Sequence, residues 1–227
     1  MVKIYYSLVL AFFLSGLQAV KAQAIDSLLD KSQDLLEEGR IFSTKGIGMA
    51  FPMGTVSDVL SPRFSSEIGL QILMKNPKLF LYPALDYMNY RYDQQVADPD
   101  FQYRTTNASA KFYIGTVSLG YITHIKKFRV FSSAGLGGGL VNEPRSSVNE
   151  EAGEIKFENK SSLTGTLRLN TGFDYGKRTF KFFAEISYLV QTRQVQNANL
   201  HTLAINVGTK TNLYRLARSI ESLRKKK

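Results

Sequence analysis

The 227-residue chain contains no cysteine and no tryptophan, and it has only two histidines, His124 and His201. The lack of cysteine excludes a disulfide framework, a thiolate metal site and a lipid-modified N-terminal cysteine. Two histidines leave little for imidazole chemistry. Proline is also scarce, whereas aromatic residues reach 12%, a content that argues against disorder. No cofactor and no metal site are predicted.

Apolar runs long enough for a transmembrane helix are missing as well. The longest run, at residues 4–14, follows Lys3 and leads to small residues at positions 20 and 22, the order typical of a secretory signal peptide. We predict that segment 1–22 is this signal. Cleavage after Ala22 and cleavage after Ala24 both fit the pattern.

The net charge of +10 reflects 29 basic against 19 acidic residues. Such an excess usually indicates a nucleic acid, an anionic membrane surface or an uneven charge distribution. Export argues against a nucleic-acid partner and favours outer-membrane lipids.

The remaining chain begins with helical periodicity at residues 25–39 and then changes to a period of two. Eight segments alternate apolar and polar side chains, which predicts eight strands at about 45–51, 63–72, 78–92, 108–123, 128–140, 163–175, 179–191 and 202–208. Within 108–123 the apolar face changes sides, so we expect a bulge near Gly115.

The predicted connections alternate in length. Short turns at 75–77, 124–127 and 176–178 are rich in lysine, and long loops are expected at 53–61, 93–107, 142–160 and 192–199. An even number of strands with short turns at one end and long loops at the other is typical of an outer-membrane barrel. The fold class is therefore all-β: an eight-stranded antiparallel transmembrane β-barrel with short N- and C-terminal helices.

A soluble exported barrel shows the same alternation, with its apolar face inside. Three features favour the membrane. The apolar faces are nearly free of charge, the polar faces carry many ionised groups beside glycine and serine, and aromatic residues gather at strand ends. We therefore predict an outer-membrane location.

The signal peptide ending in Ala-Gln, the eight alternating segments and the lysine-rich turns resemble the small outer-membrane β-barrel proteins of Bacteroidota, of the OmpA/OmpX and PorT types. The resemblance implies a non-enzymatic porin-like barrel with a structural, envelope or interaction role, including an accessory role in secretion or assembly. It departs from the pattern at the C-terminus, because a helix-like tail follows the last strand.

The polar faces supply the candidate site. Because an eight-stranded barrel is just wide enough for side chains to fill it, these charges should meet and pair inside the lumen. The alternative is a narrow ion path. The predicted network contains Arg63, Glu67, Asp86, Arg129, Arg168, Asp174, Lys181 and Glu185.

The alternative function is an enzyme that modifies lipid A, such as a deacylase or acyltransferase. That chemistry needs a nucleophile, a base and a carboxylate at the outer rim. His201 is the candidate base, but it lacks a serine two residues later. The GLGGG run at 135–139 lacks the lysine of a phosphate-binding loop, and small residues in a crowded lumen explain it better.

The sequence divides into a signal peptide (1–22), a periplasmic helix (23–43), a barrel (44–213) and a basic tail (214–227). The tail can form an amphipathic helix for anionic lipid or for a periplasmic or secretion-machinery partner. Acidic residues concentrate in the long loops, which are expected to be extracellular.

Overall fold

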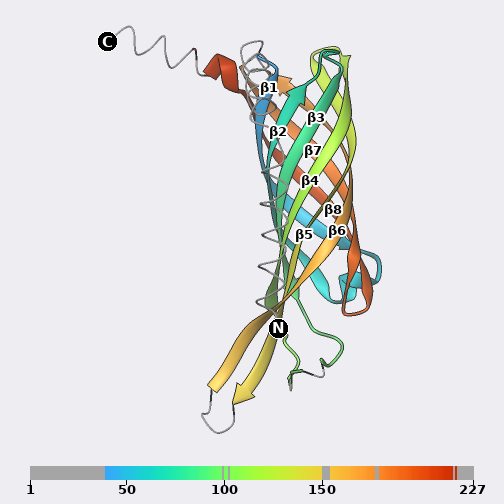
Figure 1. The fold of residues 1–227 in the computed structure, drawn as a ribbon, viewed down its shortest axis with the longest axis vertical. Coiled ribbons are helices and arrows are strands. Elements are labelled where there is room, and N and C mark those ends of the chain that lie inside the picture. The colour runs from blue at the N-terminus through green and yellow to red at the C-terminus, as the bar shows by residue number, and fades with distance from the viewer. Residues whose placement is uncertain are drawn as a thin grey trace, which may run out of the picture. The chain divides into compact units, whose positions relative to one another are not determined.

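The computed structural model describes residues 39–98, 100–101, 103–149, 154–176, 179–216 and 218. In these residues eight antiparallel strands form a closed ring (Figure 1), in which each strand pairs with the next and β8 pairs with β1. The predicted fold class is confirmed. The elements are β1 (Ile41–Met53), η1 (Gly54–Asp58), β2 (Leu60–Leu73), β3 (Leu79–Tyr92), β4 (Ala108–Ile125), β5 (Phe128–Asn149), β6 (Glu154–Gly176), β7 (Phe180–Val195) and β8 (Ala198–Asn212).

The sequence before β1 and after β8 was predicted to form separate segments. The signal peptide, residues 23–38 of the predicted helix and residues 219–227 of the tail lie outside the described residues. β1 begins at Ile41, earlier than the predicted start at residue 45, because residues 41–44 already pair with β2 and, from Phe42 onward, with β8. Residues 41–43 of the segment predicted as a helix are therefore strand. After β8, residues 213–216 are helical. No helix among the described residues is long and apolar enough to cross a membrane.

Two of the predicted long loops are wrong. The segment 142–160 is mostly strand, since the β5–β6 register continues from Leu140↔Leu163 to Asn149↔Glu154. This hairpin extends beyond the ring at the lower end in Figure 1. The segment 192–199 is also mostly strand, since β7 continues to Val195 and β8 begins at Ala198. The turn between them is Gln196 and Asn197, which adopt positive φ of 50° and 65°. The β5–β6 and β7–β8 pairs both continue beyond the residues in which apolar and polar side chains alternate. Hydrophobicity alone therefore did not predict these strand ends.

The predicted bulge near Gly115 is also wrong, because β4 keeps an unbroken register with both β3 and β5. Ala110, Phe112 and Ile114 point inward and are buried, whereas Val117 and Leu119 point outward. The apolar residues change sides along β4 because one half of the lumen is itself apolar.

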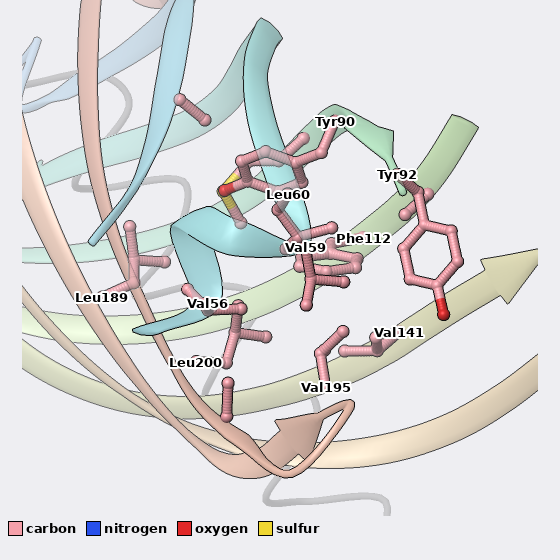
Figure 2. Packing of buried hydrophobic residues seen from close by; sticks show 14 of the residues in the cluster. Val56, Val59, Leu60, Tyr90, Tyr92, Phe112, Val141, Leu189, Val195 and Leu200 are labelled. Atoms are coloured by element: carbon pink, nitrogen blue, oxygen red, sulfur yellow. The ribbon is translucent and has the colours of Figure 1, made fainter. Parts of the chain in front are cut away.

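That apolar half lies at the end of the barrel that carries η1, the 93–107 loop and the β5–β6 hairpin, which we call the outer end; the opposite end is the turn end. Val56 of η1 is buried among side chains from several strands, and Figure 2 shows the cluster from close by. Its members include Val59, Leu60, Tyr90, Tyr92, Phe112, Val141, Leu189, Val195 and Leu200. These side chains fill the outer lumen.

The GLGGG run lies within β5, where it pairs with β4 on one side. A Cβ atom at Gly137 would lie 1.9 Å from the carbonyl oxygen of Gly115, and one at Gly139 equally close to that of Tyr113. The run therefore permits close approach of two strand backbones. It does not open a helix and does not form a phosphate-binding loop.

Candidate functional site

The middle of the lumen is organised around Arg168 of β6, whose side chain is completely buried. Its Nη2 donates to Glu67 Oε2 at 2.8 Å and to Glu185 Oε1 at 3.0 Å, and its Nη1 donates to Asp86 Oδ2 at 2.9 Å. Glu67 and Asp86 are register partners on β2 and β3. Three strands thus aim carboxylates at one guanidinium, and we call these four residues the Arg168 layer.

Further polar groups complete the Arg168 layer. The hydroxyl of Tyr82 donates a hydrogen bond to Glu67, and the Arg168 guanidinium lies 5.5 Å from the centre of the Tyr82 ring. Ser187 bridges Arg168 and Glu185 through its hydroxyl. Such neutral donors and acceptors satisfy lone pairs that a single guanidinium cannot reach.

A second group of charges lies nearer the turn end, around Asp174. Arg129 makes a bidentate contact with this carboxylate, with Nε–Oδ1 at 2.9 Å and Nη2–Oδ2 at 2.8 Å. Lys210 and Lys181 lie 3.5 and 3.6 Å from the same carboxylate. We call these residues the Asp174 layer. The Asp174 layer has three cations and one anion and therefore an excess of positive charge, whereas the Arg168 layer has an excess of negative charge.

Lys210 was missed by the sequence analysis, which followed the last strand only to Gly208. Its ammonium group lies 3.5 Å from the centre of the Phe131 ring, which favours a cation in a site otherwise shielded from water. The alternation from Thr202 through Asn206, continued by four residues, would have found it. With Lys210 included, the two layers hold four cationic and four anionic side chains.

Arg63 is the one predicted network residue that the structure places elsewhere. It is exposed, as are Pro62 and Phe64 on either side of it. The β2–β3 register shifts between Ser61 and Phe64, so the alternation that points Glu67 inward is interrupted before it reaches Arg63. A bulge of this kind re-aims a side chain away from the face that strict alternation predicts.

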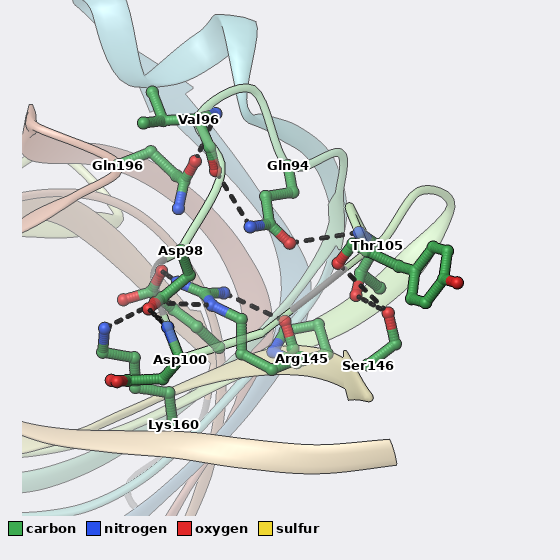
Figure 3. Close-up of polar contacts among 12 residues, drawn as sticks. Gln94, Val96, Asp98, Asp100, Thr105, Arg145, Ser146, Lys160 and Gln196 are labelled. Atoms are coloured by element: carbon green, nitrogen blue, oxygen red, sulfur yellow. Dashed lines mark hydrogen bonds and ion pairs between the residues drawn. The ribbon is translucent and has the colours of Figure 1, made fainter. Parts of the chain in front are cut away.

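The outer end carries a separate polar cluster, which joins the 93–107 loop to the β5–β6 hairpin (Figure 3). Arg145 donates from Nε to Asp98 at 3.2 Å and from Nη2 to Glu143 at 3.0 Å, and Lys160 donates to Asp98 at 2.6 Å. The hydrogen bond from Lys160 is the main reason that the pKa of Asp98 is lowered to about 2. These four residues, which we call the clasp, border a polar cavity of about 510 Å³.

The two histidines do not form a catalytic group with the described residues. The Nδ1 of His201 lies 3.0 Å from the hydroxyl of Tyr188, with the two rings stacked, and His124 is exposed beside the β4–β5 turn. In the described part of the chain, no three His, Cys, Asp or Glu side chains gather closely enough to hold a metal ion.

The outward side chains form an apolar surface, in which Leu136 is 70% exposed. Aromatic residues bracket this surface near the turn end, where Phe128 contacts Phe173 and Tyr175, and near the outer end, where Tyr87 contacts Phe64 and Tyr113. Two aromatic girdles around an apolar band are typical of a barrel in a bilayer.

A closed ring with a lipid-compatible exterior and a charged interior defines a small transmembrane β-barrel of the outer-membrane type. The solved structure of Neisserial surface protein A (NspA) has the same fold, with a TM-score of 0.51 and 16% identity over 76% of this chain and 96% of that one. No protein-family model matches the chain, and the comparison with curated proteins gave no match.

Two other solved barrels align with lower scores. Ail, the attachment invasion locus protein of Yersinia pestis, has a TM-score of 0.37 and 13% identity over 75% of this chain and 99% of that one. The N-terminal β-barrel domain of Pseudomonas aeruginosa OprF has a TM-score of 0.39 and 13% identity over 75% of this chain and 97% of that one.

Proposed function

We propose that the protein is a closed, non-enzymatic outer-membrane barrel that acts through its extracellular surface. The observation that carries this proposal is the complete burial of Arg168 among three carboxylates in the middle of the lumen. Conduction requires sites that an ion can enter and leave. Here fixed charges of both signs contact one another where an ion would have to pass.

The outer half of the lumen supports the same proposal in a different way. Val56, Phe112 and Leu189 are fully buried in an apolar cluster that lies between the Arg168 layer and the outer end. An ion crossing this region would lose its hydration among side chains that are mainly apolar, with few polar groups such as Thr202 to replace it. The two halves therefore block the lumen by independent means.

With the lumen filled, the parts left for contact with other molecules are the loops and hairpin at the outer end and the basic tail. The resemblance to PorT-type barrels of Bacteroidota supports an accessory role in secretion or assembly. Outer-membrane lipids and a periplasmic or secretion-machinery protein are the partners that fit this role. No observation favours the lipid A-modifying alternative, since His201 contacts Tyr188 and, among the residues that the structure describes, no carboxylate.

Conductance in planar bilayers tests the proposal. The purified full-length protein, inserted at high copy number, should give no steady current in 1 M salt, while a known open porin serves as the positive control. Insertion is checked separately by the shift in gel migration between heated and unheated samples. Discrete, reproducible channels from inserted protein would contradict a closed barrel.

A further inference from the structure

The β5–β6 hairpin leaves one strand edge unpaired. β6 pairs with β7 only from Thr166 onward, and among the described residues 154–164 pair with β5 alone. The opposite edge of the hairpin is occupied, because Tyr103 bridges Ser146 and the clasp holds Arg145 to the 93–107 loop. An exposed edge presents backbone donors and acceptors to any strand that can align with it.

The side chains along this edge are also exposed. Ile155 and Phe157 are 63% and 73% exposed and lie on one face of the strand. Residues 154, 156, 158 and 160 lie on the other face and read Glu, Lys, Glu, Lys. Natural edges are often protected by charged side chains, especially lysine. Side chains of alternating charge do not repel every partner strand. They favour a strand whose charges follow the complementary order.

We propose that this edge binds the same edge of a second copy of this chain, antiparallel and centred on Phe157. In this register Lys156 lies opposite Glu158 of the second copy, Glu154 lies opposite Lys160, and the two Phe157 side chains meet. Two-fold symmetry makes each charge pair occur twice. Cross-strand pairs of opposite charge stabilise antiparallel strands, and like charges destabilise them.

The neighbouring registers are unfavourable. A centre at residue 156 would place lysine opposite lysine and Glu154 opposite Glu158. A centre at residue 158 would place glutamate opposite glutamate and Lys156 opposite Lys160. Only the register centred on Phe157 pairs all four charges, so the charge order selects it. Lys160 already contacts Asp98 within its own chain, which leaves Lys156 and Glu158 as the selective pair.

The symmetry also determines how the two barrels face. In Figure 1 the hairpin runs outward from the end of the barrel and does not fold back across its mouth. A two-fold axis that relates antiparallel strands is perpendicular to them. The second barrel therefore points the opposite way, as it would in a facing membrane. This inference rests on the proposed extracellular role of the outer end.

Seven residues on each side make a small interface, so a single contact should be weak. Many copies on each of two facing membranes convert weak contacts into stable adhesion. The expected partner is thus the same protein on another cell or vesicle.

A cysteine cross-link tests the register, because the chain has no cysteine of its own. In Phe157→Cys the two introduced thiols lie directly opposite one another, within the 4.4–6.8 Å Cα separation that a disulfide allows. The matched control is Leu163→Cys, which is 79% exposed on the same strand. In the proposed register its two copies lie about 40 Å apart, at 3.4 Å per residue.

Under mild oxidation in detergent, the full-length Phe157→Cys protein should form a disulfide dimer much faster than Leu163→Cys. Adding Lys156→Glu or Glu158→Lys alone should abolish this advantage. Mixing the two charge variants should restore it, because their edges are then complementary. Equal cross-linking at both positions, or no restoration in the mixture, would overturn the proposed edge pairing.

Vesicle clustering tests the facing arrangement. Vesicles that carry the original protein should cluster. Vesicles that carry only the Lys156→Glu variant should not cluster. When these are mixed with vesicles that carry the Glu158→Lys variant, clustering should return. Cross-linking without clustering would overturn the facing geometry. Failure of the edge pairing is distinguishable from failure of the proposed function. Conductance reports on the lumen, whereas cross-linking and vesicle clustering do not.

Discussion

The two halves of the lumen are filled by opposite chemistry on the same eight strands. Toward the turn end, charged residues from β2, β3, β5, β6, β7 and β8 form the Arg168 and Asp174 layers. Toward the outer end, the same inward positions carry residues such as Phe112, Leu189 and Leu200. Apolar filling stabilises through burial, whereas buried ion pairs contribute little net stability and are costly to break. The comparison therefore predicts different responses to mutation.

Arg168→Ala should have the largest effect. It leaves three carboxylates buried without their guanidinium, and removing one partner of a buried pair typically lowers the free energy of unfolding by about 3–5 kcal/mol. The measurement is urea unfolding in vesicles. Lys126→Ala, at an exposed turn, is the control and should change stability by about 0–1 kcal/mol. Equal effects would show that the Arg168 layer is hydrated.

Val56→Ala tests the apolar half. It removes about two methylene equivalents from a fully buried side chain, and at about 0.8 kcal/mol each plus a cavity term the expected loss is about 2 kcal/mol. Val96→Ala is a matched control, because Val96 lies in another loop and is exposed. If both variants unfold at the same urea concentration, η1 does not close the outer lumen.

Asp98→Asn tests the clasp through its pH dependence. The pKa of Asp98 is lowered from 3.8 to about 2 in the folded protein. The ionised Asp98 therefore stabilises the clasp fully above about pH 4, and this stabilisation disappears as the pH falls toward 2. Protease cleavage of the 93–107 loop should therefore increase over this interval in the original protein. The variant should be cleaved readily at every pH, and Asp58→Asn should behave like the original. A flat profile in the original protein would contradict the clasp.

Lys181→Met should have the smallest effect. Lys181 is partly exposed, and Asp174 keeps both Arg129 and Lys210 after the change. The expected loss in urea unfolding is about 0–1 kcal/mol, as for an exposed pair. A loss as large as that of Arg168→Ala would mean that the excess of cations around Asp174 is itself required.

The sequence predicted the barrel and most of its charge layers because both depend on alternation, which the bilayer imposes on every strand. Glu67, Arg168 and Glu185 could each be assigned to the lumen, because each alternates with apolar residues along its own strand. Arg63 could not, because a register shift in β2 depends on pairing with β3. The inward position of Phe112 could not be predicted either, because near the outer end of β4 the apolar side chains Ala110 and Phe112 face inward and Lys111 faces outward, the reverse of what a polar lumen predicts. The clasp joins residues 98 and 145 from separate segments, a contact that no local pattern contains.

The distances along the chain between Arg168 and its partners have a consequence for assembly. Glu67, Asp86 and Glu185 are 101, 82 and 17 residues away from it in sequence. The contacts with Glu67 and Asp86 form only after the early and late strands have come together, and they slow folding for that reason. A strand inserted alone would carry unneutralised charge into lipid. The complete set of contacts to Arg168 therefore requires β2, β3, β6 and β7 to be in one barrel.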